Sequence, residues 1–209
     1  GGFTLRLVSI NSTDCGYVPP SEGSLSNVLI YNAGGWIDPD VVLSGDRLSF
    51  INGKKSITVD HGNYSGIWFW ELNDWSGDLY VGFHDSTSFN MDFNLWGNNG
   101  IAVEPKTGMV NNRGVKEQLF TPVAAGTPIG FKIDFKAQTI TAYMGSESVV
   151  ISTVLNYPTQ PANQSFTPTV TNQSSALGTG TFNFGQASFH FAAASGLKPY
   201  QRPANPFPK

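Results

Sequence analysis

The stretch Ser65-Gly66-Ile67-Trp68-Phe69-Trp70-Glu71-Leu72 has bulky side chains at every second position, and a second such run follows over residues 79–83. A period of two is the pattern of a β-strand with one buried face. Trp68 and Trp70 fall on one side of this strand, and two tryptophans bury enough apolar area to be expected near the centre of a core. Residues 73–77 break the pattern and are typical of a turn. The stretch therefore predicts a central antiparallel hairpin.

The whole chain has the composition of a single folded domain. Its 209 residues are 40% hydrophobic and only 13% charged, with a net charge of −3. The hydrophobic share excludes a disordered chain, and the negative net charge argues against a basic surface that binds nucleic acid. The one cysteine, Cys15, cannot form an intramolecular disulfide, so the fold must depend on packing. No apolar run approaches the roughly 18 residues that a membrane span needs.

Short runs with strand-like alternation recur along the chain, separated by turn residues. We expect strands at residues 3–10, 28–31, 41–43, 48–51, 56–59, 66–72, 79–83, 100–103, 129–135, 139–143, 149–151, 166–171, 180–184 and 188–191. The polar stretch 84–117 is expected to consist of long loops with one or two short strands. Because no long helical period is present, this spacing predicts an all-β fold, a two-sheet antiparallel β-sandwich with few or no helices.

The order of these segments resembles the SPRY family. Residues 66–71 are similar to the family's Gly-Lys-Trp-Tyr-Trp-Glu strand, and residues 81–82 to the Val-Gly strand that follows it. Residues 126–134 resemble the Gly-Asp-x-Ile-Gly-x-x-x-Asp pattern, and residues 183–185 the closing Asn-Phe-Gly signature. The core and turn residues of this match are Trp68, Trp70, Gly82, Asp134, Phe184 and Gly185.

The resemblance implies a concanavalin-like sandwich of two antiparallel sheets over about residues 41–200. It also implies a binding module without catalysis, which recognises a protein partner through loops at one end of the sandwich. Residues 1–40 have no counterpart in the family, and we expect an extension that packs on the sandwich or on a neighbouring chain. Residues 201–209 are rich in proline and are expected to be extended.

No catalytic or metal-binding pattern is present in the sequence. The histidines His61, His84 and His190 are scattered and lack the spacing of a zinc site. Glu71 stands alone on its strand, whereas a glycosidase needs two carboxylates that flank one bond. The sequence therefore favours a protein that is not an enzyme and that has no cofactor and no metal site.

Aromatic and arginine side chains on loops are the better functional candidates, because such residues carry much of the energy of protein interfaces. Trp75 is favoured as an exposed side chain in the expected turn, with an acidic residue on either side. The aromatic residues of the 84–117 stretch could equally fold back and cover the edge of a sheet. The candidate anchors are Asp74, Trp75, Asp78, Phe89, Trp96 and Arg113.

The low charge and the strands rich in Asn, Thr and Gly favour a virion surface protein, especially of a bacteriophage. Such a protein would lie on the virion or outside the cell and contact neighbouring subunits or a host receptor, and it could form a homo-oligomer. A cellular SPRY adaptor that binds a partner's peptide near Trp75 is one alternative. A lectin-like module, in which Trp75 or Trp96 stacks on a sugar of a glycan, is another. Neither nucleic acid binding nor membrane insertion is expected.

Overall fold

The computed structural model of the protein describes residues 30–32, 41–43, 49–52, 56–59, 66–85, 95, 98, 100–153 and 166–199. The strand expected at residues 3–10, the candidate anchors Phe89 and Trp96, and the tail at residues 201–209 lie outside the described residues.

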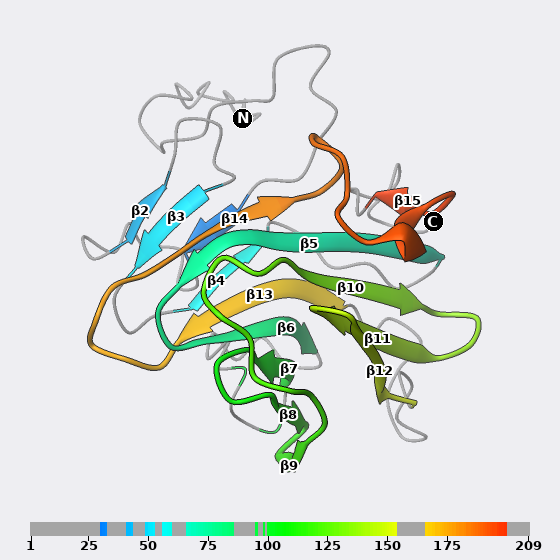
Figure 1. The fold of residues 1–209 in the computed structure, drawn as a ribbon, viewed down its shortest axis with the longest axis horizontal. Coiled ribbons are helices and arrows are strands. Elements are labelled where there is room, and N and C mark those ends of the chain that lie inside the picture. The colour runs from blue at the N-terminus through cyan, green and yellow to red at the C-terminus, as the bar shows by residue number, and fades with distance from the viewer. Residues whose placement is uncertain are drawn as a thin grey trace, which may run out of the picture.

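Two sheets of antiparallel strands pack face to face (Figure 1). In spatial order, the first sheet consists of β1 (Ile30–Asn32), β4 (Ser56–Val59), β13 (Phe166–Asn172), β6 (Leu79–Asp85), β7 (Gly100–Glu104), β8 (Met109–Asn112) and β9 (Val115–Gln118). The second consists of β12 (Glu147–Ser152), β11 (Thr139–Met144), β10 (Ile129–Asp134), β5 (Ile67–Ser76), β14 (Gly178–Asn183), β3 (Ser49–Asn52) and β2 (Val41–Leu43). The expected all-β sandwich is confirmed.

Two short elements complete the described chain. The strand β15 (Lys198–Pro199) pairs in parallel with β5, and Ala192–Ala194 form a single turn of 3-10 helix. Among the described residues, no helix has the length and hydropathy to cross a membrane. β1 lies within the expected extension of residues 1–40 and pairs with β4 at the edge of the first sheet. The domain boundary near residue 41 stays a prediction.

Trp70 lies at the centre of the core, fully buried between the two sheets. Its ring stacks on Phe131 of β10 and Phe182 of β14, with ring centroids 4.9 and 5.5 Å apart. From the opposite sheet, Phe83 of β6 meets it edge-on at 5.8 Å. Trp68 is only half-buried and packs against the margin of the same core. The expected interior position is therefore right for Trp70 and partly right for Trp68.

The other residues of the family motif occupy core or turn positions. The carboxylate of Asp134 accepts the main-chain N–H groups of Lys136 and Ala137, at 3.0 and 2.9 Å, and so shapes the turn between β10 and β11. Phe184 is buried in the core. Gly185, with a φ of 93°, lies at the start of the chain that leaves β14, directly after Phe184.

A bulge in β5 explains why residues 73–77 do not form the expected turn. The register between β5 and β14 shifts between Thr179 and Thr181, so that β5 carries one extra residue. Asp74, whose φ is 51°, lies at this bulge. Because one extra residue inverts the alternation of side chains, Trp75 turns toward the core. The expectation that Trp75 is exposed is wrong, since only 1% of its surface is accessible.

Two further segments differ from the expectation. The stretch 84–117 contains β7, β8 and most of β9, although its polar composition indicated long loops with one or two short strands. Residues 188–191 do not form a strand despite their alternating pattern. The main-chain N–H groups of His190 and Phe191 instead donate to the carboxylate of Glu71, at 2.8 and 3.2 Å.

Gly82 shows why β6 needs a glycine where it passes β7. A Cβ atom at this position would lie 2.1 Å from the carbonyl oxygen of Ile101 and 2.7 Å from the Cα of Ala102. Both are main-chain atoms of the neighbouring strand. Only a residue without a side chain allows the two strands to approach so closely.

We expect Gly82→Ala to lower the free energy of unfolding by about 3 kcal/mol or more, because the clashing atoms belong to the backbone and cannot rotate away. Gly126→Ala is the matched control. Gly126 has a φ of 84° but no atom within 4 Å of its Cβ position, so the strain should cost about 1 kcal/mol. Urea denaturation of both variants measures the difference, and equal losses would contradict the close approach.

Candidate binding surface

The turns that join β5 to β6, β7 to β8, β9 to β10, β11 to β12 and β13 to β14 lie at one end of the sandwich. We call this the loop end and define it as residues 77–78, 105–108, 119–128, 145–146 and 173–177. In Figure 1, the β5–β6 turn and the β13–β14 loop lie toward the left. The loop end therefore combines segments of both sheets that are far apart in the sequence.

Main-chain hydrogen bonds fasten these loops to one another. The N–H of Gln173 donates to the carbonyl of Asp78 at 3.0 Å, which joins the β13–β14 loop to the β5–β6 turn. The N–H of Val123 donates to the carbonyl of Pro105, also at 3.0 Å. Loops that are fixed before binding lose less conformational entropy when a partner arrives.

Trp75 supports this surface from beneath. Its indole N–H donates to the carbonyl of Thr127 at 2.6 Å, and its own carbonyl accepts the N–H of Gly126 at 2.9 Å. The ring itself belongs to the hydrophobic core. Trp75 therefore holds the loop of residues 119–128 in place and does not reach a partner directly.

Asp78 is exposed on the loop end and forms an ion pair across it. The ammonium group of Lys106, in the β7–β8 turn, lies 2.8 Å from the Asp78 carboxylate. This hydrogen bond from Lys106 holds the pKa of Asp78 below its ordinary value. The pair links two turns, but both side chains are about half exposed, so its contribution to stability is small.

Lys106→Met is expected to raise the pKa of Asp78 toward its ordinary value of 3.8. Because the folded-state pKa lies below the unfolded value, the pair stabilises the protein above the unfolded pKa. That stability is lost as the pH falls through the folded value. For an exposed pair the change should stay below about 1 kcal/mol. An NMR titration of the Asp78 carboxyl carbon tests this, and the same pKa in both proteins would contradict it.

The candidate anchors from the sequence do not form one cluster. Asp74 and Asp78 are exposed toward the loop end, with Trp75 buried between them. Arg113 lies at the opposite end, in the turn between β8 and β9. Its guanidinium carbon is 5.9 Å from the ring centroid of Phe166, so this side chain packs against the start of β13.

Leu177 is a residue of the loop end that the sequence analysis missed. It lies in the β13–β14 loop, and 64% of its surface is exposed. Among the described residues, the other exposed large apolar side chains, Ile67, Val115 and Val150, lie outside the loop end. A lone leucine in the polar run of residues 173–178 is the signal that could have identified it.

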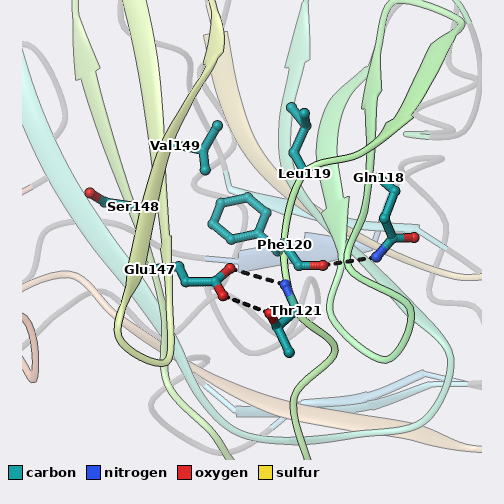
Figure 2. Close-up of a pocket in the computed structure, with 7 residues that line it drawn as sticks. All are labelled: Gln118, Leu119, Phe120, Thr121, Glu147, Ser148 and Val149. Atoms are coloured by element: carbon teal, nitrogen blue, oxygen red, sulfur yellow. Dashed lines mark hydrogen bonds between the residues drawn. The ribbon is translucent and has the colours of Figure 1, made fainter.

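A groove of about 490 Å³ lies at the margin of the loop end, beside β12 (Figure 2). The carboxylate of Glu147 accepts the main-chain N–H of Thr121 at 3.0 Å and its hydroxyl at 2.7 Å. These bonds hold the pKa of Glu147 below its ordinary value. The groove is lined by Gln118, Leu119, Phe120, Thr121, Glu147, Ser148 and Val149. Since its two sides are separated in the sequence, no local pattern reveals it.

Among the described residues, the buried titratable side chains Glu71 and His84 lie in different sheets. Glu71 is fully buried, and its carboxylate accepts hydrogen bonds from the side-chain amide of Asn183 and from two main-chain N–H groups of the C-terminal segment. His190 Nδ1 lies 3.1 Å from the same carboxylate. His84 is buried in the other sheet, on β6. In the described part of the chain, no three His, Cys, Asp or Glu side chains are grouped as metal ligands.

No family model and no curated protein matches the chain by sequence. Among solved structures, the chain is similar to the SPRY domain of human HERC1, with a TM-score of 0.56 and 18% identity over 71% of this chain and 94% of that one. It is similar to the TRIM65 PSpry domain, with a TM-score of 0.53 and 15% identity over 74% and 90%. For stonustoxin the TM-score is 0.51, with 15% identity over 74% of this chain and 26% of that chain.

Proposed function

We propose, starting from this SPRY-like β-sandwich, that the protein is a non-catalytic module that binds a protein partner through its loop end. The observation that carries the proposal is the loop end itself, where turns from both sheets are tied together and display the exposed side chain of Leu177. Binding residues commonly lie on loops that a rigid scaffold positions, and an exposed apolar side chain there gains free energy when a partner buries it. The SPRY fold of the similar structures supports this reading.

The buried carboxylate also supports a role without catalysis. Main-chain donors already engage Glu71, and the C-terminal segment covers it from solvent. His84 lies on the other sheet, so these two buried groups cannot act on one bond. The carboxylate of Glu71 therefore serves to hold the C-terminal segment on the sandwich.

Affinity capture with the purified protein as bait tests the proposal. Proteins recovered from an extract of the native source are expected to include a partner that Leu177→Asp loses. Val115→Asp is the matched control, because Val115 is 70% exposed but lies on β9, outside the loop end. If both variants recover the same proteins as the unchanged chain, the loop end is not the binding surface.

We further propose that the partner is a neighbouring virion subunit or a host receptor. Support comes from the composition, in which only 13% of residues are charged. Labelling of purified particles with an antibody against this chain should place it on their surface. A chain that is absent from particles and monomeric in the cell favours the adaptor alternative. The lectin-like alternative loses one of its two stacking candidates, because the ring of Trp75 is buried.

A further inference from the structure

The groove lies between β12 and residues 118–121, which comprise the end of β9 and the chain that follows it. β12 is the edge strand of the second sheet and β9 the edge strand of the first. The chain that leaves β9, residues 119–121, forms one wall of the groove (Figure 2). Leu119 and Val149 are partly buried and pack against the core, so they supply an apolar floor.

The free edge of β12 offers main-chain partners to an extended chain. β12 pairs with β11 on one side, and no described strand pairs with its other side. Alternate residues of such an edge direct their N–H and C=O groups outward. Ser148 is exposed, and so is Val150 at 48%, whereas Ile151 and Ser152 are buried. Glu147 and Val149 are partly exposed, so the accessible edge is short, about residues 147–150.

A short edge beside a wall suits a single peptide better than a second copy of this chain. The wall is fastened to β12 through the Glu147 side chain, which accepts two hydrogen bonds from Thr121, so two sandwiches could not bring their β12 strands together flat. The neighbouring edge β9 is also protected against self-pairing. If two copies of the chain paired their β9 strands about a twofold axis, the two registers centred on the strand would place Lys116 opposite Lys116 of the other copy, or Glu117 opposite its Glu117. Like charges directly opposite each other destabilise such a pair.

The lining of the groove indicates the chemistry of the peptide. Glu147 is the one charged side chain among the lining residues. It lies two positions from Val149 on the same strand, so both side chains face the same side of β12. A peptide that pairs with β12 would place two residues, two positions apart, next to these side chains. A basic residue suits Glu147, and an apolar residue suits Val149.

We propose that this groove binds an extended segment of a partner protein by strand addition to β12, with a Lys or Arg beside Glu147 and an apolar residue two positions away over Leu119 and Val149. This inference rests on the proposed function, because residues 119–121 belong to the loop end. Strand addition takes its affinity from main-chain hydrogen bonds and its specificity from alternate side chains.

A display library of random ten-residue peptides, selected on the purified protein, tests the inference. The enriched peptides should share a basic residue two positions from an apolar one. Glu147→Lys should lower the affinity for a synthetic peptide of this pattern about tenfold. A peptide with Glu in place of the basic residue should bind the Glu147→Lys protein with the affinity restored. Glu147→Gln, which keeps the shape of the side chain, should weaken binding less.

Modified peptides provide a readout that does not depend on folding of the variants. The backbone nitrogens of the peptide form two alternating sets, and only one set faces β12. Methylation of that set should abolish binding, whereas methylation of the other set should not. Equal effects of both sets would overturn strand addition. If binding of the peptides depends on Leu177 but not on Glu147, the groove is not the binding site, and the proposed function of the loop end is retained. If no peptide is enriched, or if Glu147→Lys dissociates a dimer, the groove is not a peptide site.

Discussion

Trp70→Ala is expected to leave little folded protein, with a loss of about 4 kcal/mol or more in the free energy of unfolding. The side chain is fully buried, and its ring contacts Phe131, Phe182 and Phe83 from three other strands in both sheets. Removing it would leave a cavity that the sheets cannot close. A domain of this kind is stable by about 5–15 kcal/mol in total, so the loss is a large part of the whole.

Two phenylalanine variants separate packing from hydrogen bonding. Among the described residues, the indole N–H of Trp70 has no hydrogen-bond partner, so Trp70→Phe should lose packing alone and cost about 2 kcal/mol. Trp75→Phe also removes the bond to the carbonyl of Thr127 and should cost about 1 kcal/mol more. Chemical denaturation followed by circular dichroism measures all three variants. Near-native stability of Trp70→Ala would show that this ring is not the centre of the core.

Glu71→Ala is expected to have the second largest effect, a loss of about 3 kcal/mol or more, because buried donors would lose a charged acceptor. The carboxylate accepts the side-chain amide of Asn183 at 3.2 Å and the main-chain N–H groups of His190 and Phe191. Ring contacts of Phe189 with Phe69, and of Phe191 with Tyr143, would remain at 5.0 and 5.6 Å. The C-terminal segment, residues 184–199, should therefore loosen before the sandwich unfolds.

Hydrogen exchange measured by mass spectrometry distinguishes local from global loss. In Glu71→Ala, peptides from residues 184–199 should exchange faster than in the unchanged protein, with a smaller change in β6 and β13. Glu71→Gln retains one acceptor oxygen and should show an intermediate effect. Glu117→Ala, at an exposed carboxylate on β9, is the control and should change neither region. Unchanged exchange of residues 184–199 in Glu71→Ala would contradict the role of this carboxylate.

Much of the fold follows from local pattern. The alternation around Trp70 predicts the central strand, its direction of burial and the all-β class, because side-chain period and turn residues are properties of neighbouring positions. Strands with clear alternation, such as β10 and β11, lie close to their expected bounds. The strands β8 and β9 were missed because polar side chains dominate this hairpin, and all four residues of β9 are exposed.

The candidate binding surface could be predicted only in outline. Loops at one end of a sandwich followed from the SPRY resemblance, and Asp78 was identified as an exposed loop residue. Leu177 was missed, and Trp75 was assigned to the surface although it is buried. The groove combines residues 118–121 with residues 147–149, which meet only after both sheets have formed.

By itself, the sequence determined the strands with clear alternation, such as β5, β10 and β11, and the interior position of Trp70, because both depend on residues close together in the chain. Tertiary structure alone decided the direction of Trp75, since its bulge exists only in the register of β5 against β14. It also decided the role of Glu71, whose donor at His190 lies 119 residues away. A buried carboxylate needs donors wherever the folded chain can supply them, and a local pattern does not contain that information.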